Sequence, residues 1–224
     1  MTRYRWYRIN VPSKNSLVSH LKEYPLTKKS EFGFLCVDEP LQKNKFLFLM
    51  REKLFVTTFD EDGNSKINEV DNLSVTKLSI IKVNKAEFIR IEDPGRNSKD
   101  LFNVLESILG FGFTSYLITF DDPRSMSIFE NVQVSRILGL KIAGAVVDSD
   151  LIARMEFVSK QGMKIEKISP LRGLKYKIDS LTFEVLIEGV KGNVSISSNG
   201  LVKVSGQLSP KIVSLIEHDL IAIK

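Results

Sequence analysis

Cationic and aromatic side chains alternate at the start of the chain, in a pattern suited to contacts with nucleic acid. Arg3, Arg5 and Arg8 are interleaved with aromatic residues that include Trp6. Cations neutralise phosphates and aromatic rings stack on unpaired bases, so this pattern is typical of a surface that binds single strands or phosphate groups. The same residues also suit a β-strand whose aromatic face lies in a core while its arginines are solvated.

Positive charge is concentrated in the first part of the chain. Between Met1 and Ser30 there are seven basic residues, Lys14 among them, and one acidic residue, a net charge of +6. Because the whole chain carries +5, the remainder carries about −1. We therefore expect electrostatic binding of a phosphate backbone to begin at the N-terminal segment.

Familiar catalytic motifs are absent from the sequence. It contains no G-x-x-x-x-G-K-[ST], G-x-S-x-G or H-E-x-x-H, and no Asp or Glu two residues before a Lys. Two carboxylate pairs, Asp121 with Asp122 and Asp148 with Asp150, fall where turns are predicted. The spacing of the second pair would suit Mg²⁺ only in a strand. We expect a non-catalytic protein with no metal and no cofactor.

The acidic stretch that begins at Asp60 matches part of the spacing of an EF-hand loop. Position 6 of that loop is Ser65 where a glycine is needed, and position 12 is Asp71 where a bidentate glutamate is needed. Strands, not helices, are predicted on both sides. The stretch is therefore interpreted as an exposed acidic hairpin tip.

The cysteine content and hydropathy indicate the compartment. The single cysteine, Cys36, lies in an apolar stretch, which predicts a buried thiol and excludes an internal disulfide. The longest apolar stretch, Ile137 to Val147, is interrupted by Lys141 and is too short to span a bilayer. No signal-peptide core follows the charged N-terminus. We expect a soluble cytoplasmic protein with no membrane partner.

The C-terminal part shows the clearest strand and turn pattern. Apolar residues alternate with polar ones from Leu181 to Ile187, and again on both sides of a Ser-Asn-Gly turn. A three-residue loop places Ile196 opposite Val202, with Gly200 in the left-handed conformation. A two-residue loop would place Ile196 opposite a lysine. The pattern therefore predicts a three-residue hairpin whose polar face carries Ser195, Ser197 and Lys203.

A helix is predicted after this hairpin. Ser209 is the expected N-cap, Pro210 suits the first helical position, and apolar residues follow at helical spacing from Ile212 to Leu220. The apolar stripe should lie on the apolar face of the hairpin, which makes a compact α+β unit.

The order of these elements resembles one repeat of the TATA-box-binding-protein-like fold. In both, three strands lead into a long helix. The second strand ends in a Ser-Ser-Gly-like turn, and the third ends near a glycine. In this chain the three strands run from Thr182 through Gly206. The resemblance implies this fold and a DNA-binding sheet. At the position of the family's kink-inducing aromatic residue the chain has Ile196, which argues against DNA bending by the mechanism of that family.

The rest of the chain reads as strands with further helices. We expect a helix within Ser13 to Tyr24 and another after Ser98, and a short helix between Ile128 and about Leu140. The expected strands are Phe32–Asp38, Lys45–Met50, Leu54–Phe59, Leu73–Val83, Glu87–Glu92, Thr114–Phe120, Leu140–Val147, Ile152–Val158 and Met163–Ile168. The fold class predicted is α+β, with mostly antiparallel sheets, a few packed helices and two small lobes. Turn residues after Asp93 place the lobe boundary between residues 1–93 and 97–224.

Two functions remain at this stage. The first is a nucleic-acid-binding, non-catalytic accessory protein that contacts DNA or RNA and a protein partner. The second is a structural or interaction subunit of a multiprotein assembly, with no nucleic-acid contact. The second function is supported by the apolar stretch from Gly139 to Val147, if this stretch forms a surface that contacts a partner. The alternative is that the stretch belongs to the core. The residues predicted to bind nucleic acid are Arg3, Arg5, Trp6, Arg8, Lys14 and Lys203.

Overall fold

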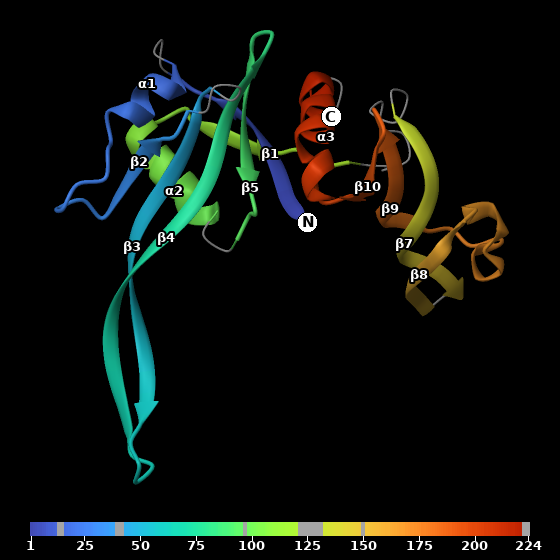
Figure 1. Cartoon of the computed structure of the whole chain (residues 1–224), viewed down its shortest axis with the longest axis horizontal. Helices are drawn as coiled ribbons and strands as arrows, with labels where there is room; N and C mark the ends of the chain where they lie inside the picture. The colour runs from blue at the N-terminus through green and yellow to red at the C-terminus, as the bar shows by residue number, and fades with distance from the viewer. Residues whose placement is uncertain (13–15, 39–42, 96–97, 121–131, 149–150, 221–224) are drawn as a thin grey trace. The chain divides into compact units, whose positions relative to one another are not determined.

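The protein is an α+β chain built mostly from antiparallel strands, as the sequence predicts. The structure is a computed structural model that describes residues 1–12, 16–38, 43–95, 98–120, 132–148 and 151–220 (Figure 1). Long stretches of the described chain pair as antiparallel ladders, and a few helices pack on them.

The backbone contacts divide the chain into two compact units. Unit 1 comprises residues 1–8, 82–88 and 116–224, and unit 2 comprises residues 9–81 and 89–115. This division differs from the predicted boundary at residues 93–97, because the helix that begins at Ser98 lies in unit 2. Each unit therefore draws on segments that are distant in the sequence.

The sheet of unit 1 joins the two ends of the chain. Its strands run in the order β1-β11-β10-β9-β7-β8. Their bounds are Thr2–Asn10 for β1, Gln133–Asp148 for β7, Leu151–Met163 for β8, Lys177–Ile187 for β9, Val190–Ser197 for β10 and Val202–Val204 for β11. The short strand β6 (Thr114–Leu117) pairs with β1 outside this order.

The predicted hairpin register between β10 and β11 is confirmed. Ile196 lies opposite Val202, and Val194 lies opposite Val204. Gly200 has a φ of 82°, and the amide of Ser197 donates to the carbonyl of Leu201 at 2.9 Å. The loop is thus three residues long, because only this length brings the apolar positions of both strands to one face.

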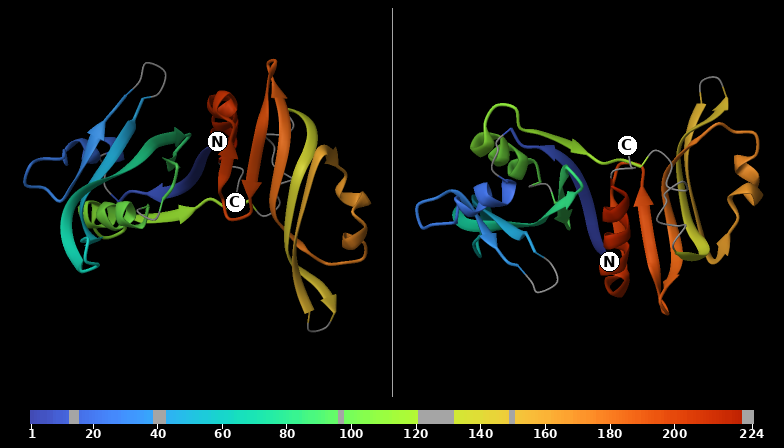
Figure 2. Two further views of the ribbon diagram at one scale, coloured as in Figure 1. Left: turned by 60° about the horizontal axis from the view of Figure 1, so that its bottom comes forward. Right: turned by 90° about the horizontal axis from the view of Figure 1, so that it is seen from above.

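Helix α3 (Ser209–Asp219) follows the hairpin and covers the apolar face of the sheet (Figure 2). The residues buried between them include Leu181, Val194, Ile196, Val202, Ile212 and Ile216. The predicted N-cap is wrong: Ser209 is the first helical residue and makes no capping bond. Its hydroxyl instead forms a short hydrogen bond with the hydroxyl of Tyr4, which ties the helix start to β1.

Unit 2 is built on a four-stranded antiparallel sheet and two helices, although residues 82–88, at one end of this sheet, belong to unit 1. Its strands run in the order β2-β3-β4-β5, with bounds Phe32–Cys36, Lys45–Phe59, Ser65–Val83 and Ala86–Glu92. Helices α1 (Leu17–Lys22) and α2 (Ser98–Leu109) supply apolar residues to its core. The core includes Leu17, Leu21, Phe34, Phe46, Phe48, Leu78, Ile91, Leu101 and Leu105.

Strands β3 and β4 are longer than the sequence pattern predicts. Residues Arg51 to Lys53 were expected to separate two strands, yet the ladder continues through them to the pair Phe59 and Ser65. The distal part of this ribbon projects beyond the other strands of unit 2 (Figure 1). Charged residues do not end a strand there because both faces of the ribbon are open to solvent, so no side chain has to be buried.

Three local predictions are wrong. Gln133 to Leu140 is strand, not helix, because it pairs along β9; the preceding residues 121–131 lie outside the described chain. The expected strand at Met163–Ile168 contains a 3-10 turn, Ile165–Lys167. Cys36 is exposed, and it is the last residue of the edge strand β2.

Candidate nucleic-acid interface

The face of the unit 1 sheet that points away from α3 carries a continuous row of polar side chains. Arg3 on β1 lies opposite Lys203 on β11, which lies opposite Ser195 on β10. Ser195 in turn lies opposite Thr182 on β9, and its hydroxyl accepts a hydrogen bond of 3.2 Å from that of Thr182. Directly opposed side chains are about 5 Å apart at their Cβ atoms. The N-terminal arginine and the C-terminal lysine therefore belong to one surface.

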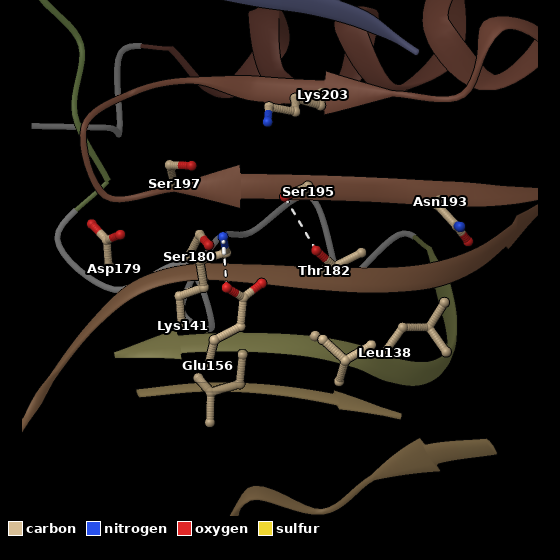
Figure 3. A pocket seen from close by; sticks show the side chains of 13 residues that line it. Leu138, Lys141, Glu156, Asp179, Ser180, Thr182, Asn193, Ser195, Ser197 and Lys203 are labelled. Atoms are coloured by element: carbon tan, nitrogen blue, oxygen red, sulfur yellow. Dashed lines mark hydrogen bonds and ion pairs between the residues drawn. The ribbon is translucent and has the colours of Figure 1, made fainter. Parts of the chain in front are cut away.

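A shallow polar pocket occupies the same face. Its volume is about 410 Å³, and Figure 3 shows the side chains that line it. The polar and charged lining residues are Lys141, Glu156, Asp179, Ser180, Thr182, Asn193, Ser195, Ser197 and Lys203. None of the lining residues is aromatic. Hydroxyl and amide groups of this kind hydrogen-bond to phosphate or sugar oxygens without reading a base.

Opposite charges pair at the β7 and β8 end of this face. The ammonium of Lys141 lies 3.0 Å from a carboxylate oxygen of Glu156. Arg136 donates two hydrogen bonds to Glu184, at 2.8 and 3.1 Å, and Lys191 lies 3.1 Å from the same carboxylate. The hydrogen bonds to Glu184, and then the negative charge of that carboxylate, raise the pKa of Arg136.

Positive charge is in excess at the other end, where β1 meets β11. Lys203 is exposed and forms no ion pair with any described residue. Arg5 lies two positions along β1 from Arg3 and is half-buried, and its Nε has no hydrogen-bond partner in the described chain. A buried donor without a partner costs free energy unless a ligand or water satisfies it. These three cations form what we call the cationic edge.

Two of the aromatic residues of β1, Tyr4 and Trp6, lie in the core, and Tyr7 is half-buried. Trp6 has no exposed surface, and Tyr4 is almost fully buried. The indole N–H of Trp6 donates to a carboxylate oxygen of Glu217 on α3, at 3.3 Å. Tyr4 and Trp6 are therefore core and Arg3 is exposed, as the second interpretation of this segment predicts, whereas Arg5 is half-buried. In this structure Trp6 presents no ring on which a base can stack.

The remaining predicted binding residues are more scattered. Arg8 is exposed on β1, beyond the cationic edge, and Lys14 lies outside the described residues. Ile196 has no exposed surface, so it offers no apolar wedge that could insert between base steps.

The carboxylates considered for metal binding form no site among the described residues. Asp148 is exposed, and Asp121, Asp122 and Asp150 lie outside the described chain. Within residues that the structure describes, no group of three or more His, Cys, Asp or Glu side chains has the proximity to hold a metal ion. The Asp60 carboxylate instead accepts hydrogen bonds from the backbone amides of Asp62 and Asn64. The acidic stretch is therefore an exposed hairpin tip, as predicted.

The sequence predicts several residues of this face, but it does not predict that β1 and the hairpin form one surface. The polar positions of the hairpin, Ser195, Ser197 and Lys203, were placed together by strand alternation. The contributions of Ser180 and Lys141 were missed, although Ser180 and Thr182 flank the apolar Leu181. No local signal indicates that β1 pairs with β11.

No protein-family profile matches the chain, and no curated protein is significantly similar to it. Across the described residues, none of the helices has both the length and the apolar character needed to cross a bilayer.

Proposed function

We propose that the protein is a non-catalytic accessory protein that binds the phosphate backbone of DNA or RNA through the cationic edge of unit 1. The observation that carries the proposal is the cross-strand position of Arg3 beside Lys203. Two cations on neighbouring strands, with Arg5 on the same strand as Arg3, present several charges to successive phosphates. In this role, unit 2 is the lobe that contacts a protein partner.

The chemistry of the face favours backbone contact over base recognition. Hydroxyl groups of Ser195, Ser197 and Thr182 lie beside the cationic edge and suit hydrogen bonds to phosphate oxygens. Trp6 is buried and the pocket lining contains no aromatic residue, so neither offers a platform on which bases stack. Tyr7, two positions along β1 from Arg5, is half-buried. Binding should therefore be sensitive to salt and weakly dependent on nucleotide sequence. The resemblance to the TATA-box-binding-protein-like fold supports the same choice of sheet and adds no evidence for bending.

The test is a triple substitution of the cationic edge, Arg3→Gln, Arg5→Gln and Lys203→Gln. Every phosphate that the variant no longer neutralises lowers the slope of log K against log salt concentration by roughly 0.7 to 0.9, so the slope should fall by about 2 to 3. Fluorescence anisotropy with labelled single-stranded and duplex oligonucleotides, over a series of salt concentrations, measures this.

A matched control removes the same charge from another part of unit 1. The variant Lys160→Gln, Arg172→Gln, Lys175→Gln changes three exposed cations that do not line the pocket. It should bind with nearly the parental slope. Equal slopes for the parent and the cationic-edge variant would refute the assignment of this face.

The second candidate is an interaction subunit without nucleic-acid contact. It is favoured by the apolar side chains that the β3–β4 ribbon exposes in unit 2. If the parent protein retains neither DNA nor RNA at about 50 mM salt, where electrostatic binding is strong, this candidate replaces the first.

A further inference from the structure

The distal part of the β3–β4 ribbon, residues 51–73, is a two-stranded arm with no third strand beside it among the described residues. Its ladder runs from the pair Arg51 and Leu73 to the pair Phe59 and Ser65. The pairing of β2 with β3 ends at Met50, so it stops before the arm begins. An isolated two-stranded hairpin is marginally stable in water and needs a packed face for further stability. An arm of this length is therefore expected to gain stability from a partner that packs on one of its faces.

One face of the arm carries large exposed apolar side chains. Phe55 and Phe59 alternate along β3, and Thr57 between them pairs with Ile67, so all these positions share one face. Phe55, Phe59 and Ile67 are 69%, 71% and 68% exposed. Leu73, opposite Arg51, extends the same face toward the base of the arm. We call this the outer face. Between Leu73 and Phe55 it also carries Lys53, Asp71 and Glu69, and Lys53 forms an ion pair with Glu69. Exposed apolar groups of this size mark interaction surfaces.

The base of the outer face is basic. Gly33 pairs with Leu49 on this side of the sheet, and a Cβ on Gly33 would lie 2.2 Å from the backbone nitrogen of Leu26, so the loop of residues 24–30 crosses the sheet there. Arg51 fastens this loop by donating hydrogen bonds to the carbonyls of Ser30 at 3.2 Å and Thr27 at 3.4 Å. The same loop carries the exposed side chains Lys28 and Lys29.

The tip of the arm is acidic. Asp60, Glu61 and Asp62 are consecutive and exposed at the turn between β3 and β4. The arm is thus polarised, with cations at its base, apolar groups and the Lys53–Glu69 ion pair along its middle, and carboxylates at its end. Residues 51 and 60 are separated by about 30 Å in an extended strand.

We propose that the arm is the interface of a homodimer, in which the outer faces of two copies pack against each other in antiparallel orientation. A twofold axis near Phe55 places the acidic tip of each copy beside Lys28, Lys29 and Arg51 of the other, and packs the two middle sections against each other. A twofold interface requires a self-complementary surface, and opposite charges at the two ends of one face satisfy this requirement.

The apolar area of the outer face agrees with a dimer of moderate stability. A fully buried aromatic side chain removes roughly 150 to 250 Å² from water. With Phe55, Phe59, Ile67 and Leu73 from each copy, the apolar contact amounts to roughly 1,000 Å², near the lower bound for a specific interface. Dimerisation should therefore be reversible and dependent on concentration.

The first test changes one face of the arm at a time in the full chain. Sedimentation velocity over a concentration series should show the parent as a monomer–dimer equilibrium. The outer-face variant Phe55→Ser, Phe59→Ser should raise the dimer Kd at least about tenfold, as removal of buried aromatic anchors does. The matched variant Leu54→Ser, Val56→Ser lies on the opposite face of the same strand and should keep the parental Kd. A parent that stays monomeric at all concentrations, or equal effects of both variants, would overturn the proposal.

The second test exchanges charge and does not depend on the apolar residues. The tip variant Glu61→Lys, Asp62→Lys and the base variant Lys28→Glu, Lys29→Glu should each fail to dimerise alone, because like charges then meet. An equimolar mixture of the two should form heterodimers, since each tip again meets a base of opposite charge. Asp60 is left unchanged because its carboxylate holds the turn. Failure of the mixture to dimerise while both variants keep the parental circular dichroism spectrum would exclude the antiparallel arrangement.

Discussion

The β9–β11 sheet of unit 1 and the arm of unit 2 use the same strand alternation with opposite results. In the sheet, alternate residues such as Leu181, Ile196 and Val202 are completely buried on the face that α3 covers. In the arm, Phe55 and Val56 point to opposite faces, and both are exposed. Alternation therefore determines which residues share a face, whereas burial depends on whether another element packs on that face.

The largest expected difference in unfolding free energy is between alanine substitutions in the turns of the two regions. Gly200 and Gly63 both have a φ of 82°, but a Cβ on Gly200 would lie 2.0 Å from the carbonyl oxygen of Ile118, whereas a Cβ on Gly63 would have no atom within 4 Å. Gly200→Ala should cost about 3 to 5 kcal/mol, from left-handed strain and the backbone clash together. Gly63→Ala should cost at most about 1 to 2 kcal/mol, from the strain alone.

Urea denaturation of both alanine variants measures this difference. Equal reductions in unfolding free energy would show that the backbone at Ile118 moves away from the added Cβ at no measurable free-energy cost. The close contact at Gly200 would then not limit which residues the turn accepts. Gly200→Val should be more destabilising than Gly200→Ala, because a β-branched residue resists a positive φ.

A smaller effect is expected from truncating matched aliphatic residues. Ile196→Ala removes atoms from beneath α3 and should destabilise the protein by about 2 to 4 kcal/mol. Val56→Ala on the arm removes atoms that are already partly in water, and should change the stability of the monomer by less than about 0.5 kcal/mol. Thermal unfolding at low protein concentration tests the pair. A destabilisation of the Val56 variant by more than about 2 kcal/mol, the size expected of a buried site, would show that the arm packs against something within one copy.

The smallest effect concerns the pH dependence of the arm tip. The amide of Asn64, then its side chain, lower the pKa of Asp60 by hydrogen bonding to the carboxylate. A folded-state pKa below the unfolded value means that Asp60 stabilises the turn above the unfolded pKa of about 3.9, and that this stabilisation disappears as the pH falls through the folded value. Asp60→Asn should remove this acid-dependent loosening of the turn. Carboxyl NMR titration measures the pKa, and a value at or above about 3.9 would contradict the hydrogen-bonded turn.

Local interactions determined what was predictable from the sequence. The hairpin of β10 and β11 was derived correctly because its turn length, the position of Gly200 and the apolar alternation all lie within one short segment. The helical stripe of α3 and the acidic turn at Asp60 are local in the same sense. On the binding face, the polar positions of the hairpin were predicted together for this reason.

Only the tertiary structure decided which segments meet. Trp6 is core because α3, more than two hundred residues later, covers β1, as the separation of 211 residues between Trp6 and Glu217 shows. The continuation of β3 through Arg51, and the exposure of Cys36, depend equally on which elements do or do not cover a strand. The sequence by itself determined the alternation of Arg3 with its aromatic neighbours and the polar position of Lys203. Their meeting on one face was decided by the pairing of β1 with β11, because the free energy of such a contact comes from burial across the whole sheet, and no local pattern encodes it.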